Sequence, residues 1–113
     1  MPLELFAGIH VRDYRAAKAW HVQLLGSEPS FIASDTEAVW ELAEHRSLYI
    51  EQNAEHAGHS VQTIFVDDLD ALVTQIAGRG LEPAKTETYP NGVRKVLYRD
   101  PDGNEIWFGG APL

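Results

Sequence analysis

The chain has 113 residues, 44% hydrophobic and 23% charged, which suits one soluble domain with its own core. It has no cysteine, which excludes disulfides, thiolate metal sites and thiol nucleophiles. Its formal net charge of −8 disfavours nucleic acid and anionic membranes as partners, and either favours cationic ligands or only aids solubility. There is no apolar run that could cross a bilayer and no signal-peptide pattern, so we expect a cytoplasmic protein.

The first half of the chain predicts one strand, one helix and three further strands. Apolar and polar residues alternate over residues 3–11, which is the period of a strand. Asp13 is placed to cap a helix, and Gly26 is placed to end it. The three strands that follow are predicted at about residues 30–34, 38–42 and 47–52.

The second half predicts the same order of elements. A strand at residues 61–66 precedes Asp68, which is placed to cap a helix that Gly78 and Gly80 end. Three more strands are predicted at about residues 84–88, 94–99 and 105–109.

The two halves read as copies of one unit. Asp13 and Asp68 occupy equivalent places, and the same offset relates Ile9 to Ile64. Residues 53–59 between them are polar and aperiodic. We therefore predict a single domain, residues 1–113, with a first βαβββ module at about 3–52, a linker at 53–59 and a second module at about 60–110.

The sequence resembles the vicinal oxygen chelate superfamily, which includes glyoxalase I, bleomycin and fosfomycin resistance proteins and extradiol dioxygenases. The residues that carry the resemblance are GIHVRDYRAAKAWHVQLLG, FVDDLDAL and VLYRDPDGNEIWF, and the last is the most specific. The resemblance implies an α+β fold in which two modules form a curved, open sheet. Helices would cover the outer face, and the inner face would form a ligand cup. It also implies a homodimer, and leaves open whether each cup is built from one chain or exchanged between two.

Metal-using members of that superfamily place a His in the first strand of each half and a Glu or Gln in the last. The positions that match these four are Phe6, Val61, Glu51 and Trp107. Only Glu51 could bind an ion, so we expect no metal and no other cofactor.

The alternation in the strands predicts which side chains line the cup. Glu51, expected to be poorly solvated among aromatic side chains, is the candidate general base or a binding anion, unless Arg94 or Lys95 neutralises it. His10 is either a proton donor and acceptor or a structural histidine. The predicted ligand-binding residues are Phe6, His10, Trp40, Tyr49, Glu51, Val61, Thr63, Phe65, Glu105 and Trp107. Of these, Trp40 lies on a predicted strand whose facing the sequence leaves open.

Other aromatic and imidazole side chains favour structural roles. Trp20 lies on the apolar stripe of the first helix and is expected in the core, whereas His21 and His45 are expected to be exposed. His56 and His59 lie in the linker and are expected to be solvated.

We predict a small-molecule binding protein similar to the bleomycin resistance branch, which sequesters its ligand without chemistry. The ligand would be apolar or aromatic, with or without a cationic group. Three alternatives remain: a metal-free isomerase, cyclase or lyase that uses Glu51 and His10 as acid and base, a metalloenzyme with displaced ligands, and a structural or regulatory dimer whose cup is filled by its own side chains.

Overall fold

The computed structural model describes residues 3–112 of the chain. The predicted α+β fold, with two tandem βαβββ modules, is confirmed, and the elements differ from the prediction only at their ends. They are β1 (Leu5–Val11), α1 (Tyr14–Leu25), β2 (Phe31–Ser34), β3 (Glu37–Ala43), β4 (Arg46–Gln52), β5 (Val61–Phe65), α2 (Leu69–Gly78), β6 (Lys85–Thr88), β7 (Arg94–Arg99) and β8 (Glu105–Gly110).

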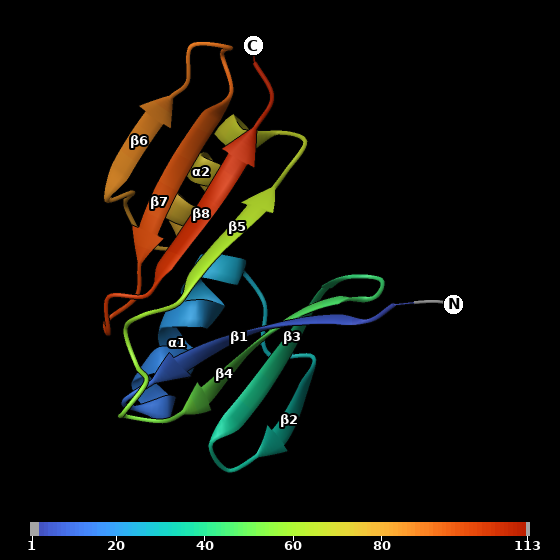
Figure 1. Cartoon of the computed structure of the whole chain (residues 1–113), viewed down its shortest axis with the longest axis vertical. Coiled ribbons are helices and arrows are strands. Elements are labelled where there is room, and N and C mark those ends of the chain that lie inside the picture. The colour runs from blue at the N-terminus through green and yellow to red at the C-terminus, as the bar shows by residue number, and fades with distance from the viewer. Residues whose placement is uncertain (1–2, 113) are drawn as a thin grey trace.

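The strands form two four-stranded sheets with the same topology. The first sheet has the order β1-β4-β3-β2 and the second has the order β5-β8-β7-β6. In each sheet the first strand pairs in parallel with the last strand of its module, and the other pairings are antiparallel. Figure 1 shows both helices behind the sheets, so the opposite face of each sheet, which we call the inner face, is not covered by a helix.

Local sequence signals set the start of both helices and the end of the first. The Asp13 carboxylate accepts a hydrogen bond from the Ala16 N–H at 3.2 Å, and the Asp68 carboxylate accepts one from the Ala71 N–H at 3.0 Å. Gly26 ends α1 with φ at 77°, a left-handed conformation that glycine adopts without steric cost. Neither helix within residues 3–112 is long and apolar enough to cross a membrane.

The hydrophobic core lies between the sheets and the helices and includes side chains from both modules. Trp20, which was expected in the core, is partly buried and packs against the core from α1. The prediction for His21 was wrong, because its side chain is fully buried between the rings of Trp20 and Trp40. Its Nδ1 bonds to the Ala17 carbonyl at 2.8 Å, and this burial lowers the pKa of His21. His45 is exposed, as predicted.

The turn between β7 and β8 joins the two modules. Asn104, which is fully buried, donates to the His10 carbonyl at 2.9 Å and to the Asp100 carboxylate at 2.8 Å. Its Oδ1 accepts from the backbone N–H and the hydroxyl of Ser60 at 3.0 and 2.9 Å. The Asp102 carboxylate accepts from the Arg12 N–H, next to the end of β1. This turn therefore fixes the second module to the end of β1.

Candidate functional site

The inner face of the first sheet carries four of the predicted site residues. Ile9, Val11, Leu48 and Ile50 lie in the core beneath the helices, so the residues that alternate with them point the other way. The four residues on the inner face are Phe6 and His10 of β1 and Tyr49 and Glu51 of β4.

The ring of Tyr49 lies across the backbone of Gly8. The two residues are register partners in β1 and β4, and a Cβ built on Gly8 would come within 2.5 Å of the Tyr49 hydroxyl. A glycine at this position therefore lets an aromatic side chain lie flat on the sheet.

The structure brings the predicted acid–base pair together. His10 and Glu51 are register partners, and the distance from His10 Nε2 to Glu51 Oε1 is 3.5 Å. Their side chains are 36% and 41% exposed, so the carboxylate is better solvated than the sequence led us to expect. Neither Arg94 nor Lys95 neutralises it, because Arg94 pairs with Asp70 of α2 and Lys95 lies on the other sheet. The linker residue His56 is exposed, as predicted, but its ring centroid is 5.7 Å from that of His10.

The inner face of the second sheet carries five more of the predicted residues. Val96, Tyr98, Ile106 and Phe108 lie in the core, which places the alternating residues of β7 and β8 on the inner face. The five predicted residues on this face are Val61, Thr63 and Phe65 of β5 and Glu105 and Trp107 of β8.

Two contacts fix the aromatic side chains of this second face. The Trp107 Nε1–H donates to the Glu105 carboxylate at 3.0 Å, which sets the orientation of the indole. The Phe65 ring lies over Gly109, where an added Cβ would come within 2.7 Å of a ring carbon. The Phe65–Gly109 contact resembles that of Tyr49 and Gly8, with the strands exchanged: here the ring comes from the first strand of the module and the glycine from the last.

Trp40 does not belong to the site, so its inclusion was an error of prediction. Its side chain is 2% exposed and lies in the core, where its ring is 5.8 Å from that of His21. The indole N–H donates to the Ser27 carbonyl at 2.9 Å. The alternation of β3 explains the placement, because Ala38 and Trp40 face the helix while Glu37, Val39 and Glu41 share the inner face with β4.

The residues at the four metal positions do not fit a metal ion. Phe6, Val61 and Trp107 offer no oxygen or imidazole ligand, and Glu51 alone cannot hold a divalent cation out of water. Among residues 3–112 there is also no cluster of three His, Asp or Glu side chains arranged to hold an ion.

Sequence reasoning missed Arg99 and the position of Lys95 over Trp107, both on the inner face of β7. Lys95 lies over the Trp107 ring at 4.5 Å from its centroid, and Arg99 lies 3.9 Å from the Glu105 carboxylate. The alternation of Lys95, Leu97 and Arg99 with Val96 and Tyr98 was the signal that could have placed them.

The two inner faces do not close on each other within one chain. In residues 3–112, no hydrogen bond or ion pair joins the predicted side chains of the first sheet to those of the second. Figure 1 shows β1 and β5 coming close at one end and diverging toward the other. The Gln62 side chain reaches across to the Gly8 carbonyl at 3.4 Å.

A pocket of about 500 Å³ lies in this gap between the sheets. In the described part of the chain, β1 pairs only with β4 and β5 only with β8, so each presents one unpaired strand edge. Several apolar side chains at the gap are exposed, including Leu5 at 65%, Phe65 at 62% and Leu42 at 41%. Unpaired edges with exposed apolar side chains are typical of surfaces that another chain covers.

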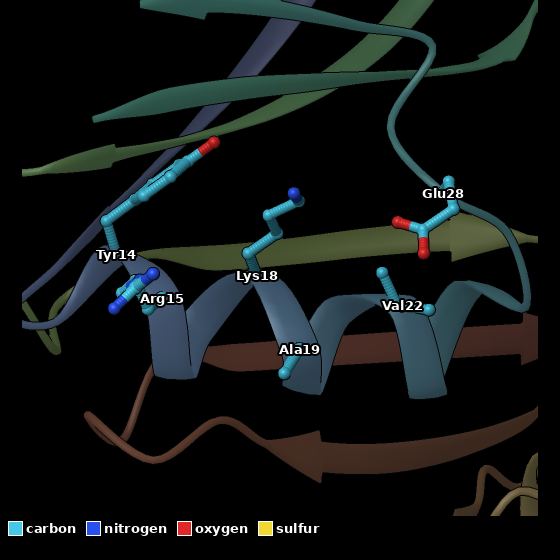
Figure 2. A pocket seen from close by; sticks show the side chains of 6 residues that line it. All are labelled: Tyr14, Arg15, Lys18, Ala19, Val22 and Glu28. Carbon is cyan, nitrogen blue, oxygen red and sulfur yellow. The ribbon is translucent and has the colours of Figure 1, made fainter. Parts of the chain in front are cut away.

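A second pocket, of about 450 Å³, lies on α1 and contains none of the predicted site residues. Figure 2 shows Tyr14, Lys18 and Val22 on one flank of the helix, with Glu28 on the loop that leaves it. Burial and the nearby Asp35 carboxylate raise the pKa of Tyr14.

A family model described as the Glyoxalase/Bleomycin resistance protein/Dioxygenase superfamily matches residues 5–108. The chain belongs to this superfamily. A glyoxalase/bleomycin resistance protein from Catenulispora acidiphila is 58% identical, with a TM-score of 0.95 over 98% of this chain and 100% of that chain. No protein with a curated description matched the sequence.

More distant structures share the fold alone. Lactoylglutathione lyase from Agrobacterium tumefaciens is 19% identical, with a TM-score of 0.77 over 94% of this chain and 91% of that chain. A bleomycin-binding protein in complex with bleomycin is 16% identical, with a TM-score of 0.76 over 95% of this chain and 97% of that chain. The same fold is thus found in a lactoylglutathione lyase and in a bleomycin-binding protein.

Proposed function

We propose that this protein binds an apolar or aromatic small molecule without a metal, in a cup that two copies of the chain complete. The observation that carries the proposal is the chemistry of the inner faces. Three of the four positions that would hold a metal carry Phe6, Val61 and Trp107. Of these residues, Phe6 is 49% exposed and Val61 is 61% exposed. Exposed apolar walls with a few polar groups suit a small organic ligand. Glu51 on the first sheet suits a ligand that also carries a cationic group.

The proposed homodimer follows from the unpaired edges of β1 and β5. Within one chain the two inner faces diverge, so a ligand on one face meets no opposing wall from the other. Pairing β1 of one copy against β5 of a second copy would satisfy both edges and cover the apolar side chains of the gap. Each cup would then combine the first module of one chain with the second module of its partner.

The relatives support binding as the activity, and the composition supports the remaining details. One distant structural neighbour holds bleomycin, and another, from Streptomyces sp. CB03234, is an antibiotic-binding protein. We propose that the protein is cytoplasmic. We also propose that neither nucleic acid nor a membrane is its partner, because a net charge of −8 disfavours binding to both.

A ligand screen tests the proposed function. A library of aromatic compounds, half of them cationic, is screened by thermal shift, and each hit is measured by calorimetry and checked for chemical change by mass spectrometry. We expect saturable binding without turnover, and loss of binding in Trp107→Ala. The matched control is Trp20→Ala, which removes an indole from the helix side and should leave ligand affinity unchanged in the folded protein. Turnover of a hit would contradict sequestration, and a screen without hits would favour a cup filled by its own side chains.

The dimer has a separate test in sedimentation. We expect the native chain to sediment as a dimer, and Leu5→Glu to shift it toward the monomer because Leu5 lies at the gap and is 65% exposed. Ile32→Glu is the control, because Ile32 is 52% exposed on β2, away from the gap. A native monomer, or equal effects of the two variants, would overturn this part of the proposal.

The contact between His10 and Glu51 favours a second candidate, a metal-free isomerase or lyase. An imidazole and a carboxylate 3.5 Å apart can pass a proton between adjacent atoms of a substrate. Glu51→Gln keeps the shape of the side chain and removes the base. Turnover by the native protein that Glu51→Gln abolishes, with binding retained, would establish the enzyme, whereas weaker binding with no turnover in either protein would identify Glu51 as a binding anion.

A further inference from the structure

The inner face of the second sheet carries three cations but only two carboxylates. The amino group of Lys85 lies 2.9 Å from the Glu87 carboxylate, and the Arg99 guanidinium lies 3.9 Å from that of Glu105. Lys95 is the third cation, and no carboxylate within residues 3–112 forms an ion pair with it. Its register partner across the strands is Glu87, which Lys85 already neutralises.

Lys95 instead lies over aromatic rings. Its amino group is 4.5 Å from the centroid of the Trp107 ring and 5.9 Å from that of Tyr89. A cation over an indole is attracted to the negative face of the ring. Trp107 is 9% exposed, so little of its indole is open to solvent while the Lys95 amino group lies over the ring.

An aromatic ligand can stack on Trp107 only if the amino group of Lys95 moves aside. The four-carbon stem of lysine is flexible, so the amino group can reach the edge of a ring that has taken its place. There it would lose its contact with the indole. An acidic substituent on the ligand would compensate by forming a charge-assisted hydrogen bond with the amino group.

We infer that Lys95 determines ligand specificity, and that the ligand is an aromatic molecule with an acidic substituent such as a carboxylate, sulfonate or phenolate. This inference rests on the proposed function and names the chemical class that the second sheet takes. A ligand whose ring carries a positive charge is disfavoured at Trp107, because it would compete with Lys95 for the same ring face and repel it. A cationic group elsewhere on the ligand would have to lie toward Glu51 on the opposite wall.

Three probes of one shape and different charge test the inference: naphthoate, naphthylmethanol and naphthylmethylammonium. Their affinities are measured by calorimetry for the full chain, and the indole N–H signal of Trp107, assigned with Trp107→Phe, reports contact by proton–nitrogen NMR. We expect naphthoate to bind roughly tenfold more tightly than naphthylmethanol, the typical effect of one charge-assisted hydrogen bond, and naphthylmethylammonium to bind least. The net charge of −8 would by itself favour the cationic probe over the anionic one. A preference for naphthoate would therefore point to a local cation rather than to the overall charge of the protein.

Lys95→Met keeps the apolar stem and removes the charge, so it should abolish the preference for naphthoate while naphthylmethanol still binds. Lys95→Arg should retain the preference, and Lys18→Met, which removes a cation of α1 on the helix side, should retain it as well. Equal affinity of the native chain for all three probes, or a preference that survives in Lys95→Met, would overturn the inference and leave the proposed function standing. If no probe moves the Trp107 signal, the inference is overturned, and the ligand screen decides separately whether the proposed function stands.

Discussion

Asn104→Ala should destabilise the protein more than an alanine substitution of an exposed polar residue in any other turn of the chain. The Asn104 side chain is fully buried and makes four hydrogen bonds, at 2.8 to 3.0 Å, to Ser60, His10 and Asp100. In Asn104→Ala each bond costs about 1 kcal/mol, and the buried Asp100 carboxylate, 5% exposed, also loses a donor, so we expect a total of roughly 3 to 5 kcal/mol. That is a large fraction of the stability of a domain of this size.

The assay is urea unfolding followed by tryptophan fluorescence, at one protein concentration for all variants because a dimer unfolds in a concentration-dependent way. Asn91→Ala is the control, since Asn91 accepts a single hydrogen bond from Val93 in an exposed turn and should cost at most about 1 kcal/mol. Asn104→Asp adds a second test, because it turns the donor toward Asp100 into a second carboxylate and should be no more stable than Asn104→Ala. If Asn104→Ala were no more destabilising than Asn91→Ala, the turn would not be what fixes the second module to β1.

Three further predictions concern the core and the inner face. Burial lowers the pKa of His21 below its ordinary value of 6.5, so the unfolded chain binds a proton first and the stability of the fold should fall as pH drops below about 6.5. Thermal midpoints should show this loss in the native chain and in His59→Gln, and less of it in His21→Gln. A loss of equal size in all three proteins would contradict the prediction. Gly8→Ala would place a methyl group against the Tyr49 ring and should lower the free energy of unfolding by about 1 to 3 kcal/mol. The control is Gly78→Ala, whose added methyl group meets no atom within 4 Å and should leave stability unchanged. Equal unfolding midpoints of the two variants would show that the ring does not lie on Gly8. Trp40→Phe removes the hydrogen bond to Ser27 and leaves a void, so urea unfolding should show a loss of roughly 2 to 3 kcal/mol of stability. Trp20→Phe, at a half-buried position, should lose less. A smaller loss in Trp40→Phe than in Trp20→Phe would argue against the buried placement of Trp40.

The fold was predictable because its signals are local. Alternation along the strands, an aspartate before each helix and a glycine after the first are short-range patterns, and the structure confirms each of them. The placement of His10 beside Glu51 followed in the same way, because parallel pairing of β1 and β4 leaves the alternating residues of both strands on one face.

The errors arose where packing between distant elements decides the outcome. His21 is buried because Trp20 and Trp40 enclose its ring, and Trp40 comes from another element whose facing the sequence left open. The role of Lys95 depends on the pairing of β7 with β8, which sets its amino group over Trp107. The divergence of the two inner faces depends on how the turn at Asn104 fixes one module to the other, and no pattern within either module reveals that geometry.

Binding of an aromatic ligand to chelator-treated protein tests the metal-independent cup most directly. The protein is stripped with a strong chelator, its metal content is measured by mass spectrometry, and a ligand from the screen is titrated before and after divalent cations are returned. We expect the same affinity in both titrations, with metal far below one ion per chain. Affinity that disappears on stripping and returns with a divalent cation would show that residues at this site hold an ion, and would contradict the proposed function.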